Sequence, residues 1–202
     1  MRSFWLAVLL LSAAQPAKAH SFVGGAGYYD QFTEGAAVIL SYPAIFIPLG
    51  ALALLVCLWD RDGLPRILPT FFASQIVGIF VASFFGELAI LFLMTVGVIT
   101  AVLGALQTKL PNTTVFLMTA LTGSGALCAA LEGHALFELP PFIYVGLFFA
   151  CSLVVMVCAG LAKVILDKFT FGWVRTGLRV MSSWIGAILV FMMAFEISVL
   201  VG

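Results

Sequence analysis

Six long apolar stretches constrain the fold of this chain more than any other feature of its sequence. They occupy residues 37–58, 67–85, 88–106, 114–131, 142–162 and 180–201, and Glu196 is the only charged residue within them. Each comes close to or reaches the ~20 residues that a helix needs to cross a ~30 Å hydrocarbon layer. Lipid offers no partner to an unpaired backbone group, and the runs do not alternate as barrel strands do, so we expect helices. The sequence therefore predicts an all-α membrane protein, a six-transmembrane-helix bundle.

The composition supports a bilayer environment and excludes several classes of function. Of the 202 residues, 63% are hydrophobic and 9% are charged, with a mean hydropathy of +1.21, whereas a soluble domain carries about 25% charged residues. The formal net charge is zero and no basic patch occurs, which excludes nucleic acid as a partner. The chain has no G-x-x-x-x-G-K-S/T motif for ATP and no catalytic constellation that would identify an enzyme. We expect a single transmembrane domain over residues 20–202, with short connections.

The first 19 residues have the pattern of a secretory signal peptide. Arg2 precedes a short apolar run at residues 4–11, and Ala17 and Ala19 supply the small residues that a signal peptidase requires. The run is too short to span a bilayer, which favours cleavage over an uncleaved anchor. The mature chain would then begin at His20, outside the cytoplasm.

The basic residues predict an orientation in the membrane. With the mature N-terminus outside, all seven basic residues beyond the signal peptide fall in or beside the three inner loops, and the outer side carries only carboxylates. The basic residues are Arg61, Arg66, Lys109, Lys163, Lys168, Arg175 and Arg179, and the outer acids are Asp30, Glu34, Glu87, Glu132, Glu138 and Glu196. We therefore expect a bacterial inner-membrane protein with both mature termini on the periplasmic side.

The segment between the fourth and fifth stretches is the most informative candidate site. Glu132, His134 and Glu138 lie within seven residues, and a helix would place His134 and Glu138 on one face. Imidazole with carboxylates suits nickel, zinc, copper or iron better than magnesium or calcium. The alternative for this segment is a solvated turn without a metal. The alternative for the acidic outer side is that it lacks basic residues only because these are retained inside.

Three further residues are candidates for binding or attracting a cation. As a mature N-terminus, His20 would offer an α-amine and a ring nitrogen, a pair that suits copper(II) or nickel(II). The alternative is that His20 is simply the residue that follows the cleavage site. Glu87 and Glu196 would supply a negative field or a second ligand at the outer surface.

Other unusual residues have structural explanations. Gly97, Gly104 and the segment 122–125 are expected to let helices approach closely, and Gln75 to bond to a neighbouring helix. Pro43 and Pro48 are expected to interrupt the first helix, where freed carbonyls can line a site. The four cysteines, which form no C-x-x-C pair, are expected to pack within the spans.

The layout resembles the HupE/UreJ family of small bacterial membrane proteins. The resemblance rests on Ala19-His20, on residues 32–35 before a proline-bearing first helix, and on Glu138-Leu139-Pro140 after His134. Members are encoded with hydrogenases or ureases and are regarded as nickel or cobalt permeases. The family has His-Pro and then Asp-His in helix one, where this chain has Tyr42-Pro43 and Pro48-Leu49. The resemblance implies Glu138 and His134 as the retained site residues.

Two hypotheses of function follow. The first is a permease that gathers a divalent transition metal (nickel, cobalt or copper) at the acidic outer face, with no tightly bound cofactor. The second is a structural or assembly subunit of a larger membrane complex, favoured by the missing ligands and by the 19 phenylalanines, since aromatic area suits a surface that faces lipid or other membrane subunits.

Overall fold

In the computed structural model, the described residues are 22, 27–86, 88–106, 110–169 and 171–201, with side chains to 198. Within these ranges the chain forms seven α-helices. They are α2 (Tyr28–Ser41), α3 (Pro43–Trp59), α4 (Gly63–Phe85), α5 (Leu88–Leu106), α6 (Asn112–Ala130), α7 (Pro141–Lys168) and α8 (Gly172–Val201). The predicted signal peptide at 1–19 lies outside the described residues.

Five of these helices, α4 to α8, are long and apolar enough to cross a membrane. The helices α2 and α3 are long and apolar enough to cross a membrane only when taken together, as a pair bent by 72°. The prediction of a helical bundle of the membrane type is therefore confirmed, with five helices of spanning length and a sixth if the bent pair forms one span.

The predicted first span, over residues 37–58, lies in two helices. It begins earlier, at Tyr28, and divides into two helices at Tyr42. A residue before proline is disfavoured in the helical region, and Tyr42 adopts an extended conformation with φ −103° and ψ 102°. The expected interruption therefore occurs at Pro43, which becomes the first residue of α3. At Pro48 the helix continues.

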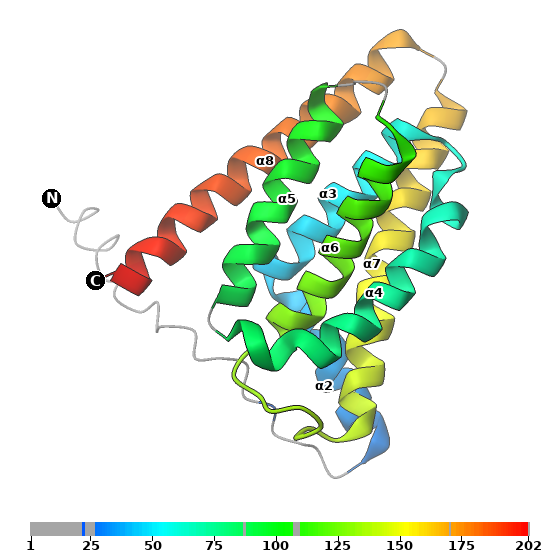
Figure 1. Cartoon of the computed structure of the whole chain (residues 1–202). Helices are drawn as coiled ribbons and strands as arrows, with labels where there is room; N and C mark the ends of the chain where they lie inside the picture. Colours follow the sequence, from blue (N-terminus) through cyan, green and yellow to red (C-terminus); the bar gives the residue numbers. More distant parts are fainter. Residues whose placement is uncertain (1–21, 23–26, 87, 107–109, 170, 202) are drawn as a thin grey trace, which may run out of the picture.

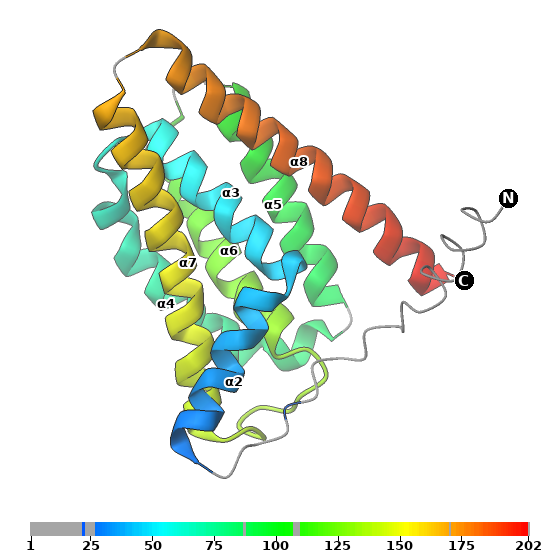
Figure 2. The same ribbon diagram turned by 180° about the vertical axis from the view of Figure 1, so that it is seen from behind.

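The bundle is built around α3, which contacts each of the other helices. Between Pro43 and Leu58 its only polar side-chain group is the Cys57 thiol, and most of its residues are fully buried. Figure 2 shows α3 lying between α7 and α8, while α2 lies at the lower end of the bundle against α7. A helix that is apolar around its whole circumference is the expected element for the centre of such a bundle.

Glycines allow the closest helix contacts. A Cβ on Gly35 in α2 would collide with the Ile143 carbonyl oxygen of α7, and one on Gly146 would collide with the Phe32 carbonyl oxygen of α2. Between α5 and α8, a Cβ on Gly104 would lie 2.6 Å from the Ser182 hydroxyl oxygen. The close approach expected at Gly97 and Gly104 is confirmed, since Gly97 packs against Pro48 of α3.

Buried hydrogen bonds connect helices through the middle of the bundle. Gln75 Nε2 of α4 donates to Ser152 Oγ of α7 at 3.2 Å, which confirms the expected interhelical bond. The Cys57 thiol donates to the Ala159 carbonyl of α7, and the Cys128 thiol to the Gly78 carbonyl of α4. These cysteines therefore join helices as weak donors as well as by packing.

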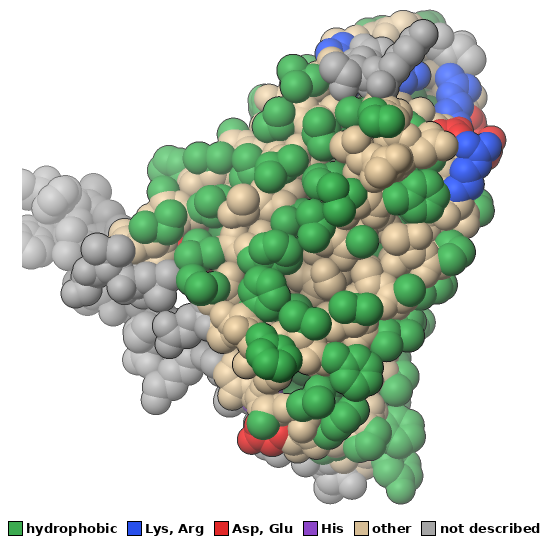
Figure 3. Space-filling view, in the orientation of Figure 1, with side chains coloured by type: hydrophobic (Ala, Val, Ile, Leu, Met, Phe, Trp, Pro, Cys, Tyr) green, Lys and Arg blue, Asp and Glu red, His purple; other side chains and the backbone are tan. Residues whose placement is uncertain are grey.

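The described charged side chains gather at the two ends of the bundle. Figure 3 shows a surface rich in hydrophobic side chains, with Lys and Arg at the upper end. In the same orientation, Figure 1 shows that α7 meets α8 and α3 meets α4 at this end. Arg175 donates to the Leu58 carbonyl and Arg179 to the Ala105 carbonyl. The start of α8 therefore lies beside the ends of α3 and α5, and we call this the basic end.

Candidate functional site

The connection between α6 and α7, at the end opposite the basic one, carries Glu132, His134 and Glu138. It consists of turns, so the expectation that a helix places His134 and Glu138 on one face is wrong. Gly133 and Phe137 have φ of 80° and 60°, a left-handed conformation that stops a helix from continuing. The spacing of four residues therefore does not place these two side chains on a helix face.

The polar groups of this connection stabilise its turns. Glu138 Oε2 accepts a 2.7 Å hydrogen bond from the Ala135 backbone N–H. His134 Nδ1 lies 3.1 Å from the Glu132 carbonyl oxygen, to which it donates when the proton is on Nδ1. In that tautomer Nε2 keeps its lone pair, which is the form in which histidine binds metals.

His134 is wedged between aromatic and aliphatic side chains. Its ring meets Phe22 edge-to-face, with 5.1 Å between the centroids. It also lines a narrow crevice with Ile79, Ala82 and Tyr144, which has no room for a water molecule. The imidazole is therefore held in place by packing as well as by its hydrogen bond.

The predicted metal ligands do not form a complete cluster in the described part of the chain. There, no three side chains of His, Cys, Asp or Glu converge in a way that could hold a metal ion. His20 and Glu87 lie outside the described residues. A metal site formed by the five predicted ligands, His134, Glu138, Glu132, His20 and Glu87, stays a prediction.

A different group of side chains influences the point where the bent pair α2–α3 is broken. Tyr42, the residue at the break, is partly buried, and the negative charges of Glu132 and Glu196 act on its phenol. Tyr42 also packs against a small core of Ala44, Met94 and Leu189, which joins α3, α5 and α8. Three distant parts of the sequence therefore contribute to the electrostatic surroundings of Tyr42, and we call Tyr42, Glu132 and Glu196 the break site.

Each member of the break site is visible in the sequence, but their proximity is not. Glu132 follows the fourth apolar stretch, Glu196 is the one charge in the sixth, and Tyr42 precedes the proline that interrupts the first. What the three residues share in the sequence is a polar side chain near the same end of a span. Their joint electrostatic effect on Tyr42 depends on the bend at Tyr42 and on the direction of α8, and hydropathy reveals neither.

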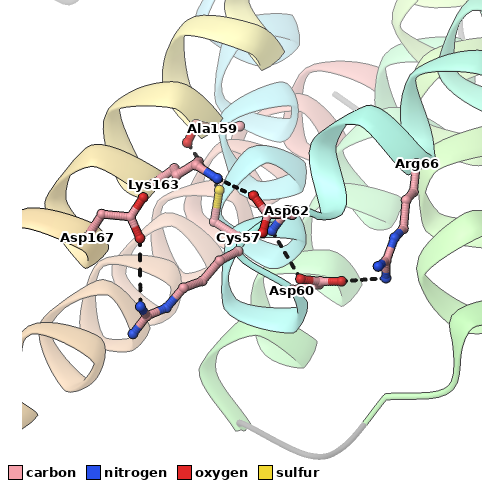
Figure 4. Close-up of polar contacts among 8 residues, drawn as sticks. Cys57, Asp60, Asp62, Arg66, Ala159, Lys163 and Asp167 are labelled. Atoms are coloured by element: carbon pink, nitrogen blue, oxygen red, sulfur yellow. Dashed lines mark hydrogen bonds and ion pairs between the residues drawn. The ribbon is translucent and has the colours of Figure 1, made fainter.

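The basic end is held by ion pairs between separate segments (Figure 4). Lys163 of α7 binds Asp62, Arg66 of α4 binds Asp60 at 2.5 Å, and Arg61 lies 3.7 Å from Asp167. The hydrogen bond from Lys163 and its positive charge lower the pKa of the Asp62 carboxyl below its ordinary 3.8. The pairs of Lys163 and Asp167 tie the turn between α3 and α4 to the end of α7.

The chain was compared with family models, with curated proteins and with solved structures, and none of the three comparisons gave a match.

Proposed function

We propose that this chain is an integral membrane permease that admits a divalent metal ion at the break site. The observation that carries the proposal is that the negative charges of Glu132 and Glu196 both act on Tyr42, at a break in a helix pair of spanning length. Two carboxylates near one point attract a cation and can exchange water for direct contacts with it.

The broken helix supplies further ligands. Pro43 has no N–H, so the Ile39 carbonyl, which would accept it in a continuous helix, is left without that donor. Unwound carbonyls beside carboxylates are a common form of ion site in transporters with discontinuous helices. The break site therefore combines carboxylate, phenol and carbonyl oxygens at one end of the bundle.

The ligand chemistry limits the class of metal. The resemblance to the HupE/UreJ family favours nickel or cobalt, and His134 Nε2 is an imidazole donor on the same connection as Glu132. The three side chains of the break site offer only oxygen, which suits manganese as well. We therefore propose a divalent first-row metal as the transported ion.

We further propose six spans, with α2 and α3 together forming the first, in a bacterial inner membrane. The signal peptide would be removed, and both mature termini would lie on the periplasmic side. The gathering of the described Lys and Arg side chains at one end supports this orientation, because basic loops are retained in the cytoplasm. The break site then faces the periplasm.

Metal flux into proteoliposomes tests the permease directly. The purified chain is reconstituted, and entry of Ni²⁺, Co²⁺, Cu²⁺ and Mn²⁺ is followed with an indicator inside the vesicles. We expect saturable entry of at least one ion, and a loss of roughly tenfold or more in the Glu132→Gln, Glu196→Gln double variant, as for changes around other metal sites.

A matched control separates the break site from general surface charge. Asp30→Asn removes an exposed carboxylate in the first turn of α2, at the same end of the bundle, and should leave flux unchanged. Absence of flux for all four ions, or an equal loss in Asp30→Asn, would contradict the proposal. Circular dichroism and size-exclusion profiles show whether each variant is folded.

A second function, as a structural subunit of a membrane complex, is favoured by α8. This helix is buried over a smaller share of its length than the other four helices of spanning length. It exposes large side chains such as Trp184, Phe191 and Phe195. Under this alternative the chain co-purifies with other membrane proteins in mild detergent and conducts no metal alone.

A further inference from the structure

An apolar groove of about 360 Å³ lies between α3, α7 and α8. Its wall includes Phe46 and Gly50 of α3, Leu161 of α7, and Met181 and Ile188 of α8, and none of the described residues that line it is charged. The groove is open along one side, in the region where Figure 2 shows α7 and α8 diverging on either side of α3.

The groove exists because α8 packs on α5 rather than on α7. Ser182 of α8 donates to the Ala101 carbonyl of α5 at 2.9 Å, and Gly104 lets the two helices approach. On the floor of the groove, Gly50 contributes no side chain, and a Cβ there would meet nothing within 4 Å. The space is therefore a fixed feature of the helix packing.

Basic side chains continue both walls of the groove toward the basic end. Lys168 is three residues beyond the lining residue Ile165, and Arg175 is three residues before the lining residue Leu178. Residues three apart on a helix share a face. Lys168 is exposed and makes no hydrogen bond or ion pair with another described residue. Arg175 donates one bond to Leu58, which leaves other guanidinium N–H groups for a ligand.

The lining of the groove favours a hydrocarbon chain as its occupant. From Leu178 to Ile188 its α8 wall rises about 15 Å, and none of the described lining residues along it is charged. An extended acyl chain lying along this wall would bury only apolar surface, and acyl chains are what the hydrocarbon layer of a bilayer supplies.

We propose that this groove binds an anionic phospholipid, with one acyl chain along α3 and the phosphate held by Lys168 and Arg175. Basic groups at the headgroup level, beside an apolar space between helices, are a recurring arrangement for anionic lipids. The volume is within the range of about 300–1,000 Å³ typical of ligand sites. This inference does not depend on metal transport.

Native mass spectrometry of the full chain in mild detergent tests the site. Phosphatidylglycerol and phosphatidylcholine are titrated separately, and we expect one phosphatidylglycerol to be retained in preference. Gly50→Leu fills the groove and should abolish this retained lipid. Gly160→Leu is the matched control, because it adds the same side chain to α7 at a position that also has open space but does not line the groove.

The charge component has its own variant. Lys168→Gln should weaken phosphatidylglycerol binding about fivefold, the effect of one basic residue near an anionic headgroup, and leave phosphatidylcholine binding unchanged. Equal retention of both lipids by the wild type would overturn the proposal. Equal losses in Gly50→Leu and Gly160→Leu, or a co-purifying polypeptide released by Gly50→Leu, would also overturn it. Thermal melts of each variant exclude unfolding as the cause.

Discussion

At the basic end, one aspartate connects two segments that are distant in the sequence. Asp62 lies in the turn between α3 and α4, and its partner Lys163 lies a hundred residues later in α7. The Asp62 side chain is largely exposed and the Lys163 side chain partly so, and the pair therefore contributes modestly and is screened by salt. Its role is to join the turn to α7, and its charge makes this connection dependent on pH.

Asp62→Asn is expected to remove an acid-sensitive part of the stability. Because the pKa of Asp62 is lowered in the folded protein, its contribution is fully present above the ordinary value of 3.8 and is lost as the pH falls through the lower folded value. The melting temperatures of wild type and variant should differ at pH 6 and converge below pH 3.8. A difference that grows in acid would contradict this assignment. Lys163→Gln should reproduce the effect, and the double variant should add little.

The buried pair Gln75–Ser152 predicts an asymmetry between two substitutions. Gln75 Oε1 is buried and has no hydrogen-bond partner among the described residues. Gln75→Leu therefore removes one bond and one unsatisfied acceptor together, whereas Ser152→Ala leaves the buried Nε2 without its acceptor. We expect Ser152→Ala to cost about 1 kcal/mol and Gln75→Leu less, because interhelical bonds in membranes average about 0.6 kcal/mol. Unfolding in mixed micelles measures both, and the reverse order would contradict the prediction.

At the scale of the helix, the sequence predicts which segments are helical better than where they end. The bounds of α5 coincide with the predicted stretch at 88–106. By contrast, α7 extends to Lys168 rather than 162, and α8 begins at Gly172 rather than 180. Hydropathy marks the part of a helix that suits lipid, but polar residues can continue the same helix into water.

The contact between α2 and α7 depends on a glycine in each helix. Gly146→Ala places a methyl group against the Phe32 carbonyl, so the helices must separate. We expect a loss of about 1–3 kcal/mol in the free energy of unfolding, the usual cost of overpacking. Gly160→Ala, also within α7 but facing open space, should be neutral or stabilising because alanine favours helix. Equal effects of the two substitutions on the melting temperature would show that the close contact between α2 and α7 does not limit the stability of the protein.

At the scale of the whole molecule, the sequence predicts the charge pattern but not the site. The restriction of basic residues to one end follows from the order of the spans, and the described Lys and Arg side chains do gather at that end. The joint influence of Glu132 and Glu196 on Tyr42 could not be predicted, since it depends on how the helices cross. The expected helix face for His134 and Glu138 is absent, because the connection that carries them consists of turns.

Both proposals depend on which end of the bundle faces the cytoplasm. Collection of an incoming ion requires the break site to face the periplasm, and the lipid site then lies in the cytoplasmic leaflet, where anionic headgroups attract basic residues. Two exposed positions report the two ends. Leu136 lies in the connection between α6 and α7, and Phe169 follows α7 at the basic end.

Labelling of single added cysteines in intact cells tests this orientation most directly. The four native cysteines lie within membrane helices and are buried or half-buried, which leaves the added thiol as the accessible one. With a membrane-impermeant maleimide, Leu136→Cys should react in intact spheroplasts, and Phe169→Cys only after the membrane is opened. The opposite result, with Phe169→Cys labelled in intact cells and Leu136→Cys protected, would contradict the account.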